Sequence, residues 1–101
     1  MIPFRFHPEA RIEARAAAAW YRERSHTAAR AFAEILDEGI RSIRELPEAW
    51  PSWPGRTDTR RRVLQRFPYS IVYIIDLSAI VVVAVAHQLR KPGYWLPRLS
   101  P

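Results

Sequence analysis

Residues Arg60–Trp95 read RRRVLQRFPYSIVYIIDLSAIVVVAVAHQLRKPGYW, and most of the predicted fold follows from them. They contain two apolar runs long enough for strands, Ser70–Asp76 and Ile80–Ala86, joined by the short hairpin loop Asp76–Ala79. The second run is apolar at every position, which predicts a central strand covered on both faces. Because three arginines precede the runs and a basic, aromatic segment follows them, we expect a sheet with a charged surface along one side.

The residues before this stretch predict a strand and two helices. Ile2–Phe6 alternates apolar and polar side chains as a short strand does, and amphipathic helices follow at Arg11–Arg24 and Ala28–Leu46. The first helix has a predicted apolar stripe anchored by Trp20, and Gly39 in the second helix indicates a close backbone crossing. The stripe follows the positions Ile12, Ala16, Ala19, Trp20 and Glu23.

The order of the elements predicts the fold class. Pro47–Asp58 is a proline-rich loop whose Trp50 and Trp53 are expected to pin it onto the core, and Arg60–Phe67 is expected to be a further strand. Strand, helix, helix and three strands predict an α+β fold, a small, mostly antiparallel sheet with a helical hairpin packed on one face. At 101 residues, the chain is expected to form a single domain, 1–101.

The charge is distributed unevenly along the chain. The formal net charge is +6. Up to Trp50, eight basic residues are matched by eight acidic ones, whereas the rest of the chain has eight basic residues and two acidic ones. A one-sided basic surface indicates a polyanion or an acidic protein as partner, the alternative being a merely solvated basic face.

Several classes of protein are disfavoured by composition. There is no cysteine, which excludes a disulfide framework and a thiolate zinc site and fits a cytoplasmic protein. Met1–His7 lacks the long apolar region of a signal peptide, and the longest apolar run, Ala79–Ala86, is too short to span a membrane. The three histidines are far apart in the sequence, so we expect no metal and no other cofactor, and His7 suits a helix cap.

Side chains capable of chemistry follow the last predicted strand. His87 immediately follows that strand, and Arg62 and Arg66 on a neighbouring strand could face the same place. The next eight residues include Gln88, Arg90, Lys91, Tyr94 and Trp95. Cleavage of RNA by internal attack needs a base, an acid and cations around the phosphate, and an aromatic ring can stack an unpaired base. A structural role for the same residues is the alternative.

Four segments carry a resemblance to a known family. They are FHPEA (Phe6–Ala10), Trp20-Tyr21, RRVLQRFPYSIVY (Arg61–Tyr73) and AVAHQLRKPGYW (Ala84–Trp95). In their order and spacing the chain resembles the RelE/ParE superfamily of bacterial type II toxins. The resemblance implies the fold predicted above and a growth-inhibiting toxin that is held inactive by a cognate antitoxin, whose acidic segment is expected to cover the basic face.

The resemblance implies two possible targets. RelE-like members cleave mRNA on the ribosome, and ParE-like members poison DNA gyrase without that catalytic set. A RelE-like activity, toward which the prediction leans, would use His87 as base or acid, Arg66 and Arg90 as phosphate stabilisers, and Tyr94 as a positioning or stacking group. Contacts to nucleic acid would come from Arg60, Arg61, Arg62, Lys91 and Trp95. However, ribonucleolytic members often carry lysines near the second strand, where this chain has only arginines, which are poor proton donors and acceptors. A toxin homologue that has lost its activity and acts only as an antitoxin-binding regulator of its own operon is the third alternative.

Overall fold

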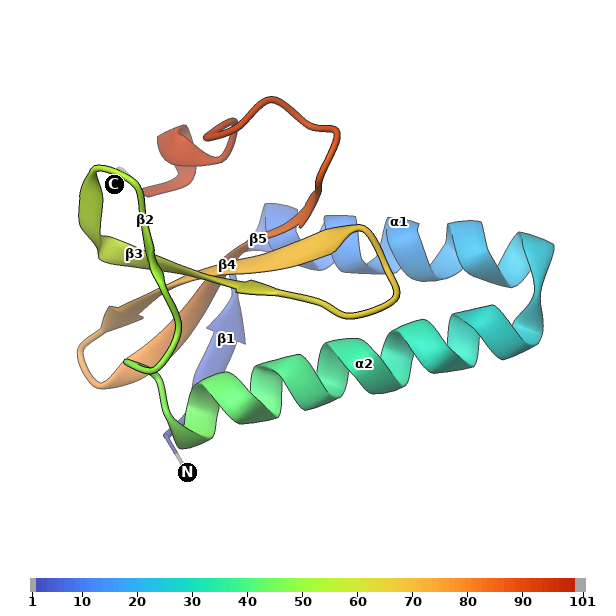
Figure 1. The fold of residues 1–101 in the computed structure, drawn as a ribbon, viewed down its shortest axis with the longest axis horizontal. Coiled ribbons are helices and arrows are strands. Elements are labelled where there is room, and N and C mark those ends of the chain that lie inside the picture. The colour runs from blue at the N-terminus through green and yellow to red at the C-terminus, as the bar shows by residue number, and fades with distance from the viewer. Residues whose placement is uncertain (1, 100–101) are drawn as a thin grey trace.

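The computed structural model describes residues 2–99, in which five strands form one mixed sheet with the order β1-β5-β4-β3-β2 (Figure 1). The elements are β1 (Phe4–Phe6), α1 (Pro8–Arg24), α2 (His26–Glu45), β2 (Ser52–Trp53), β3 (Arg56–Val63), β4 (Tyr69–Asp76), β5 (Ala79–His87) and the 3-10 helix η1 (Leu96–Leu99). This arrangement confirms the predicted α+β class and the predicted order of elements. None of the described helices combines the length and the apolar character needed to cross a membrane.

The centre of the sheet is the hairpin formed by β4 and β5. The two strands pair antiparallel from Tyr69↔His87 to Asp76↔Ala79, with a register shift between Val72 and Tyr73. The first strand, β1, pairs parallel with β5 at the other side, so β5 lies between two neighbours. Its alternate side chains lie in two different apolar clusters, which confirms that this strand is covered on both faces.

The helical hairpin covers one face of the sheet. Its core joins Phe32, Ile40 and Ile43 of α2 to Ile71 and Tyr73 of β4. Gly39 packs tightly against core side chains, because a Cβ atom built on it would be 2.9 Å from side-chain atoms of both Ile71 and Leu64. Gly39 therefore makes room for apolar side chains of the core, whereas the prediction was a close crossing of another backbone.

The opposite face is covered by the C-terminal segment. After β5 the chain turns back across the sheet and ends in η1 (Figure 1). Trp95 is 1% exposed and packs edge-on against Trp53 of β2, with ring centroids 4.9 Å apart. The loop before β3 is thus pinned onto the core by tryptophan, as predicted, but it also contains the two-residue strand β2, which was not predicted.

The apolar stripe predicted for the first helix is wrong. Ile12 is 58% exposed and Trp20 is 51% exposed, whereas the buried positions of α1 are Ala10 and Ala17. A helix can approach a sheet more closely with alanine than with tryptophan at the contact, so α1 presents its small residues to the core. Trp20 instead lies on the surface, with the guanidinium carbon of Arg24 3.6 Å from its ring centroid.

Candidate functional site at the end of the last strand

His87 is the last residue of β5 and lies opposite Tyr69 of β4. The two rings meet edge to face, with centroids 5.0 Å apart. Nδ1 of His87 accepts a hydrogen bond from the backbone N–H of Leu89 at 3.1 Å. Because Nδ1 accepts, it carries no proton, and the neutral ring therefore holds its proton on Nε2. His87 thus offers a hydrogen-bond donor, Nε2–H, toward its surroundings.

Two surface hollows meet at His87, each with a volume of about 450 Å³. They share His87, Arg90 and Tyr94 as a common wall. The first, called here the helix-side hollow, is bounded by α1 through Ala16, Ala17, Trp20 and Tyr21. The second, called here the basic hollow, lies on the face away from the helices and includes Arg61, Arg90, Lys91 and Trp53. None of the described residues that line the basic hollow is acidic.

The wall between the hollows is held by contacts within the C-terminal segment. The guanidinium carbon of Arg90 lies 3.8 Å from the centroid of the Tyr94 ring, and the backbone N–H of Arg90 donates to the carbonyl of His87 at 3.0 Å. Arg90 and Lys91 are exposed. These two cations are therefore free to meet an anionic partner at the rim of the basic hollow.

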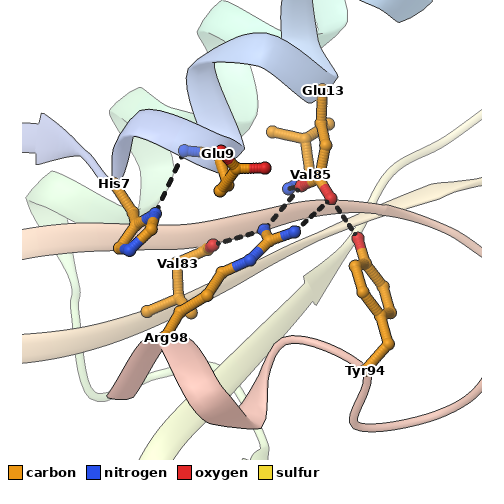
Figure 2. Close-up of polar contacts among 7 residues, drawn as sticks. All are labelled: His7, Glu9, Glu13, Val83, Val85, Tyr94 and Arg98. Carbon is orange, nitrogen blue, oxygen red and sulfur yellow. Dashed lines mark hydrogen bonds and ion pairs between the residues drawn. The ribbon is translucent and has the colours of Figure 1, made fainter. Parts of the chain in front are cut away.

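Tyr94 is tied to a buried ion pair that was not predicted from the sequence (Figure 2). Glu13 of α1 accepts from the Tyr94 hydroxyl at 2.7 Å, from both terminal nitrogens of Arg98 at 3.0 and 2.8 Å, and from the backbone N–H of Val85 at 3.0 Å. Arg98 also donates to the carbonyl of Val83 at 3.0 Å. The side chains of Glu13 and Arg98 are only 15% and 14% exposed. This cluster, the Glu13 node, fastens the end of the chain to the first helix.

The Glu13 node shifts the titration of its members. Burial acts to raise the pKa of Glu13, but the hydrogen bonds from Arg98, Tyr94 and Val85 outweigh it and lower the pKa overall. Burial, followed by the hydrogen bond to the Glu13 carboxylate, raises the pKa of Tyr94 well above its ordinary value. The Tyr94 hydroxyl is therefore held as a neutral donor to Glu13, a contact that leaves it unsuited to exchange protons with a substrate.

The arginines of β3 divide between the two faces of the sheet. Arg61 faces the basic hollow, where its guanidinium carbon is 5.1 Å from the centroid of the Trp53 ring. Arg62 lies on the helix face, 3.3 Å from the Ser42 hydroxyl, and Arg60 donates to the carbonyls of Glu48 and Trp50 at 3.1 and 2.6 Å. The expectation that Arg62 faces the same place as His87 is wrong, because alternate residues of a strand point to opposite faces.

Two further residues of the predicted site are placed differently from the prediction, since Arg66 lines neither hollow and Trp95 is buried. Arg66 is in the turn between β3 and β4, where it is exposed and adopts a left-handed backbone with φ of 68°. Trp95 is buried against Trp53, so its ring has no face free to stack a base. The structure thus gathers His87, Arg61, Arg90 and Lys91 at one hollow, and it gives Trp95 a place in the core.

A sequence signal for Glu13 did exist. Glu13 lies between the buried alanines of α1, three residues after Ala10 and four before Ala17, and so falls on the helix face that contacts the sheet. An acidic residue on a buried face needs a partner.

For a metal the chain offers less, since residues 2–99 contain no group of three or more His, Asp or Glu side chains close enough to hold an ion. His7 caps α1 by accepting from the backbone N–H of Glu9 at 3.0 Å, as predicted.

Comparisons with known proteins identify the family from the sequence and the fold from solved structures. Residues 4–92 match the family described as the ParE toxin of the type II toxin–antitoxin system, parDE. A solved chain of the chromosomal ParDE toxin–antitoxin system from P. aeruginosa is similar with a TM-score of 0.72 at 15% identity, covering 86% of this chain and 96% of that one. The isolated E. coli RelE toxin is similar with a TM-score of 0.63 at 21% identity, covering 99% of this chain and 100% of that one. No curated protein matches the sequence.

Proposed function

Since this chain belongs to the family of ParE toxins of type II toxin–antitoxin systems, we propose that it stops growth by binding DNA gyrase and not by cutting RNA. The observation that carries the proposal is the hydrogen bond from the Leu89 N–H to Nδ1 of His87. It leaves the neutral imidazole with its proton on Nε2 and with Nδ1 occupied by the backbone. A general base must present an unprotonated nitrogen to the hydroxyl it activates, so His87 is arranged as a donor.

The residues around His87 support the same conclusion. The Tyr94 hydroxyl donates to Glu13, and burial with that bond raises its pKa, so it is a poor acid and a poor base at neutral pH. The cations of the basic hollow are Arg61, Arg90 and Lys91. Arginine binds anions but does not transfer protons at neutral pH. A surface with donors and cations but without a matched acid and base is suited to binding a macromolecule.

An mRNA endonuclease is the second candidate, and the basic hollow favours it. Three cations from two different elements line one hollow next to a histidine, and no described residue of its lining is acidic. Such a surface would hold the phosphates of RNA. For His87 to act as a base there, the bond to Leu89 would have to break so that the proton could move to Nδ1.

The antitoxin expected for this family is proposed to cover both hollows. Trp20 and Tyr21 give the helix-side hollow an apolar wall, and Arg90 and Lys91 lie next to it on the rim of the basic hollow. An amphipathic segment with acidic side chains would match both features, with apolar residues against α1 and carboxylates against the cations.

The first experiment follows macromolecular synthesis after the toxin is induced without antitoxin. We expect thymidine incorporation to fall before methionine incorporation, and purified toxin to inhibit supercoiling by gyrase. An early fall in methionine incorporation with cleaved mRNA would support the endonuclease instead. If neither precursor is affected by soluble toxin, the inactive-homologue alternative would hold.

The variant His87→Ala separates the two activities. We expect it to keep substantial toxicity if the target is gyrase, because removing one hydrogen-bond donor weakens binding without removing a chemical step, and to lose toxicity if His87 acts on RNA. His26→Ala is the matched control, since this histidine is exposed at the start of α2. Thermal unfolding of both variants must first show that they fold.

A further inference from the structure

The hairpin between β4 and β5 turns through two residues that both have left-handed backbones. Leu77 has φ of 50° and Ser78 has φ of 66°, between the paired residues Asp76 and Ala79. Two-residue hairpins with positive φ at both positions strongly favour asparagine, aspartate and glycine, because other side chains are strained there. A leucine at the first position is therefore unfavourable for the fold.

The leucine side chain does not compensate for this strain by burial. Leu77 is 96% exposed, so its apolar surface stays in water. Ile75, two residues earlier on β4, is 41% exposed and adds apolar surface next to the turn. The strained backbone and the exposed apolar side chain both make leucine unfavourable at this position. A contact between Leu77 and another molecule would account for its presence there.

The tip of this hairpin lies far from the candidate site. Leu77 precedes the first residue of β5, and His87 is its last, so the two are separated by the length of the strand, roughly 26 Å at about 3.3 Å per residue. The charged residues at the base of the tip pair with each other, since Arg5 and Asp76 lie 3.5 Å apart. The tip is thus apolar and locally neutral, unlike the basic hollow.

We propose that Leu77, supported by Ile75, is an anchor that inserts into an apolar pocket of the protein on which the toxin acts. The inference rests on the proposed function, in which that protein is gyrase. An aliphatic side chain beside a neutralised ion pair suits a protein pocket, whereas contact with nucleic acid requires free cations. The hairpin tip is apolar and neutral, and in this it also differs from the surface that is proposed to bind an acidic antitoxin segment.

The test uses Leu77→Asn, which suits the turn and removes the anchor. We expect the melting temperature to stay equal or to rise by roughly 2–8 °C, because asparagine tolerates a positive φ. Binding to purified gyrase is expected to weaken roughly tenfold or more, with a matching loss of toxicity. Ser78→Gly is the matched control, because it relaxes the same turn and keeps the leucine, so it should bind and inhibit like the wild type. Leu77→Met should also retain binding.

The outcomes separate the inference from the proposed function. Equal gyrase binding and toxicity of Leu77→Asn and wild type would overturn the inference while leaving the gyrase proposal intact. Failure of the wild-type protein to bind gyrase would refute the proposed function, and the anchor would then be judged by toxicity alone, with equal toxicity of Leu77→Asn overturning it. A wild-type dimer in solution that Leu77→Asn converts to a monomer would also overturn it, since the leucine would then contact a second copy of this chain.

Discussion

The substitution Glu13→Ala should destabilise the protein more than any change of an exposed acidic residue. It removes the acceptor of four hydrogen bonds and leaves the Arg98 cation, the Tyr94 hydroxyl and the Val85 N–H without their partner. Removing one member of a buried ion pair costs about 3–5 kcal/mol. Because both side chains keep about 15% exposure and Arg98 retains the Val83 carbonyl, we expect the low end, about 3 kcal/mol.

Urea unfolding followed by circular dichroism measures this loss. A loss of about 3 kcal/mol corresponds to a fall in melting temperature of roughly 12–24 °C for a domain of this size. Amide hydrogen exchange should show where the loss occurs, since the residues of η1 are fastened to α1 through Glu13 and should lose protection first. Glu23→Ala, an exposed acidic residue on the same helix, is the control and should change stability by less than about 0.5 kcal/mol.

A double variant tests whether the loss comes from the unpaired charge. Glu13→Leu with Arg98→Met replaces the buried pair by apolar side chains, so it should be more stable than Glu13→Ala alone. The reasoning is refuted if Glu13→Ala unfolds at the same urea concentration as Glu23→Ala and protects η1 equally well.

The remaining predictions concern the pH dependence of stability and the packing around Gly39. Folding lowers the pKa of Glu13 below its ordinary value of 4.5. The ionised carboxylate therefore stabilises the protein at any pH above 4.5, and this contribution is lost as the pH falls through the folded-state pKa. The stability advantage of the wild type over Glu13→Gln should therefore shrink below about pH 4.5, and urea titrations at pH 7 and pH 3.5 would contradict this if the advantage were constant. Gly39→Ala should cost about 1 kcal/mol net, because the new Cβ would lie 2.9 Å from the terminal methyl carbons of Ile71 and Leu64, and an overpacking cost of about 2 kcal/mol exceeds the helix-propensity gain of about 1 kcal/mol. An unchanged or higher urea midpoint for Gly39→Ala would show that the sheet gives way to the methyl group.

The strands that could be predicted are those whose pattern is long enough to be unambiguous. β4 and β5 follow from apolar runs, and β1 from alternation over a few residues. β2 could not be predicted, because two residues carry no periodicity and their pairing depends on β3. In α1 the sequence pattern favours the stripe with the largest apolar side chains, whereas the packed face is the one whose small residues allow a close approach to β5.

The candidate site was predicted less completely than the fold. His87 and its neighbours Arg90 and Lys91 follow directly from their place after β5. The sequence does not predict which face of the sheet each β3 arginine occupies. Three consecutive arginines give the same pattern whichever of them point toward the helices. Glu13 and Arg98 are 85 residues apart, and their contact depends on how the C-terminal segment crosses the sheet.

The pairing of β1 with β5 and the tie from Glu13 to Arg98 have a consequence for how the toxin is made. β1 pairs with residues 80–82 of β5, and Glu13 of α1 forms its ion pair with Arg98. A ribosome synthesises the chain from the N-terminus, so the first contact cannot form before residues 80–82 are translated and the second cannot form before residue 98. We therefore expect a nascent chain that is shorter than 98 residues to lack the finished hollows at His87, so that a partner of these hollows can bind only after that segment has been made.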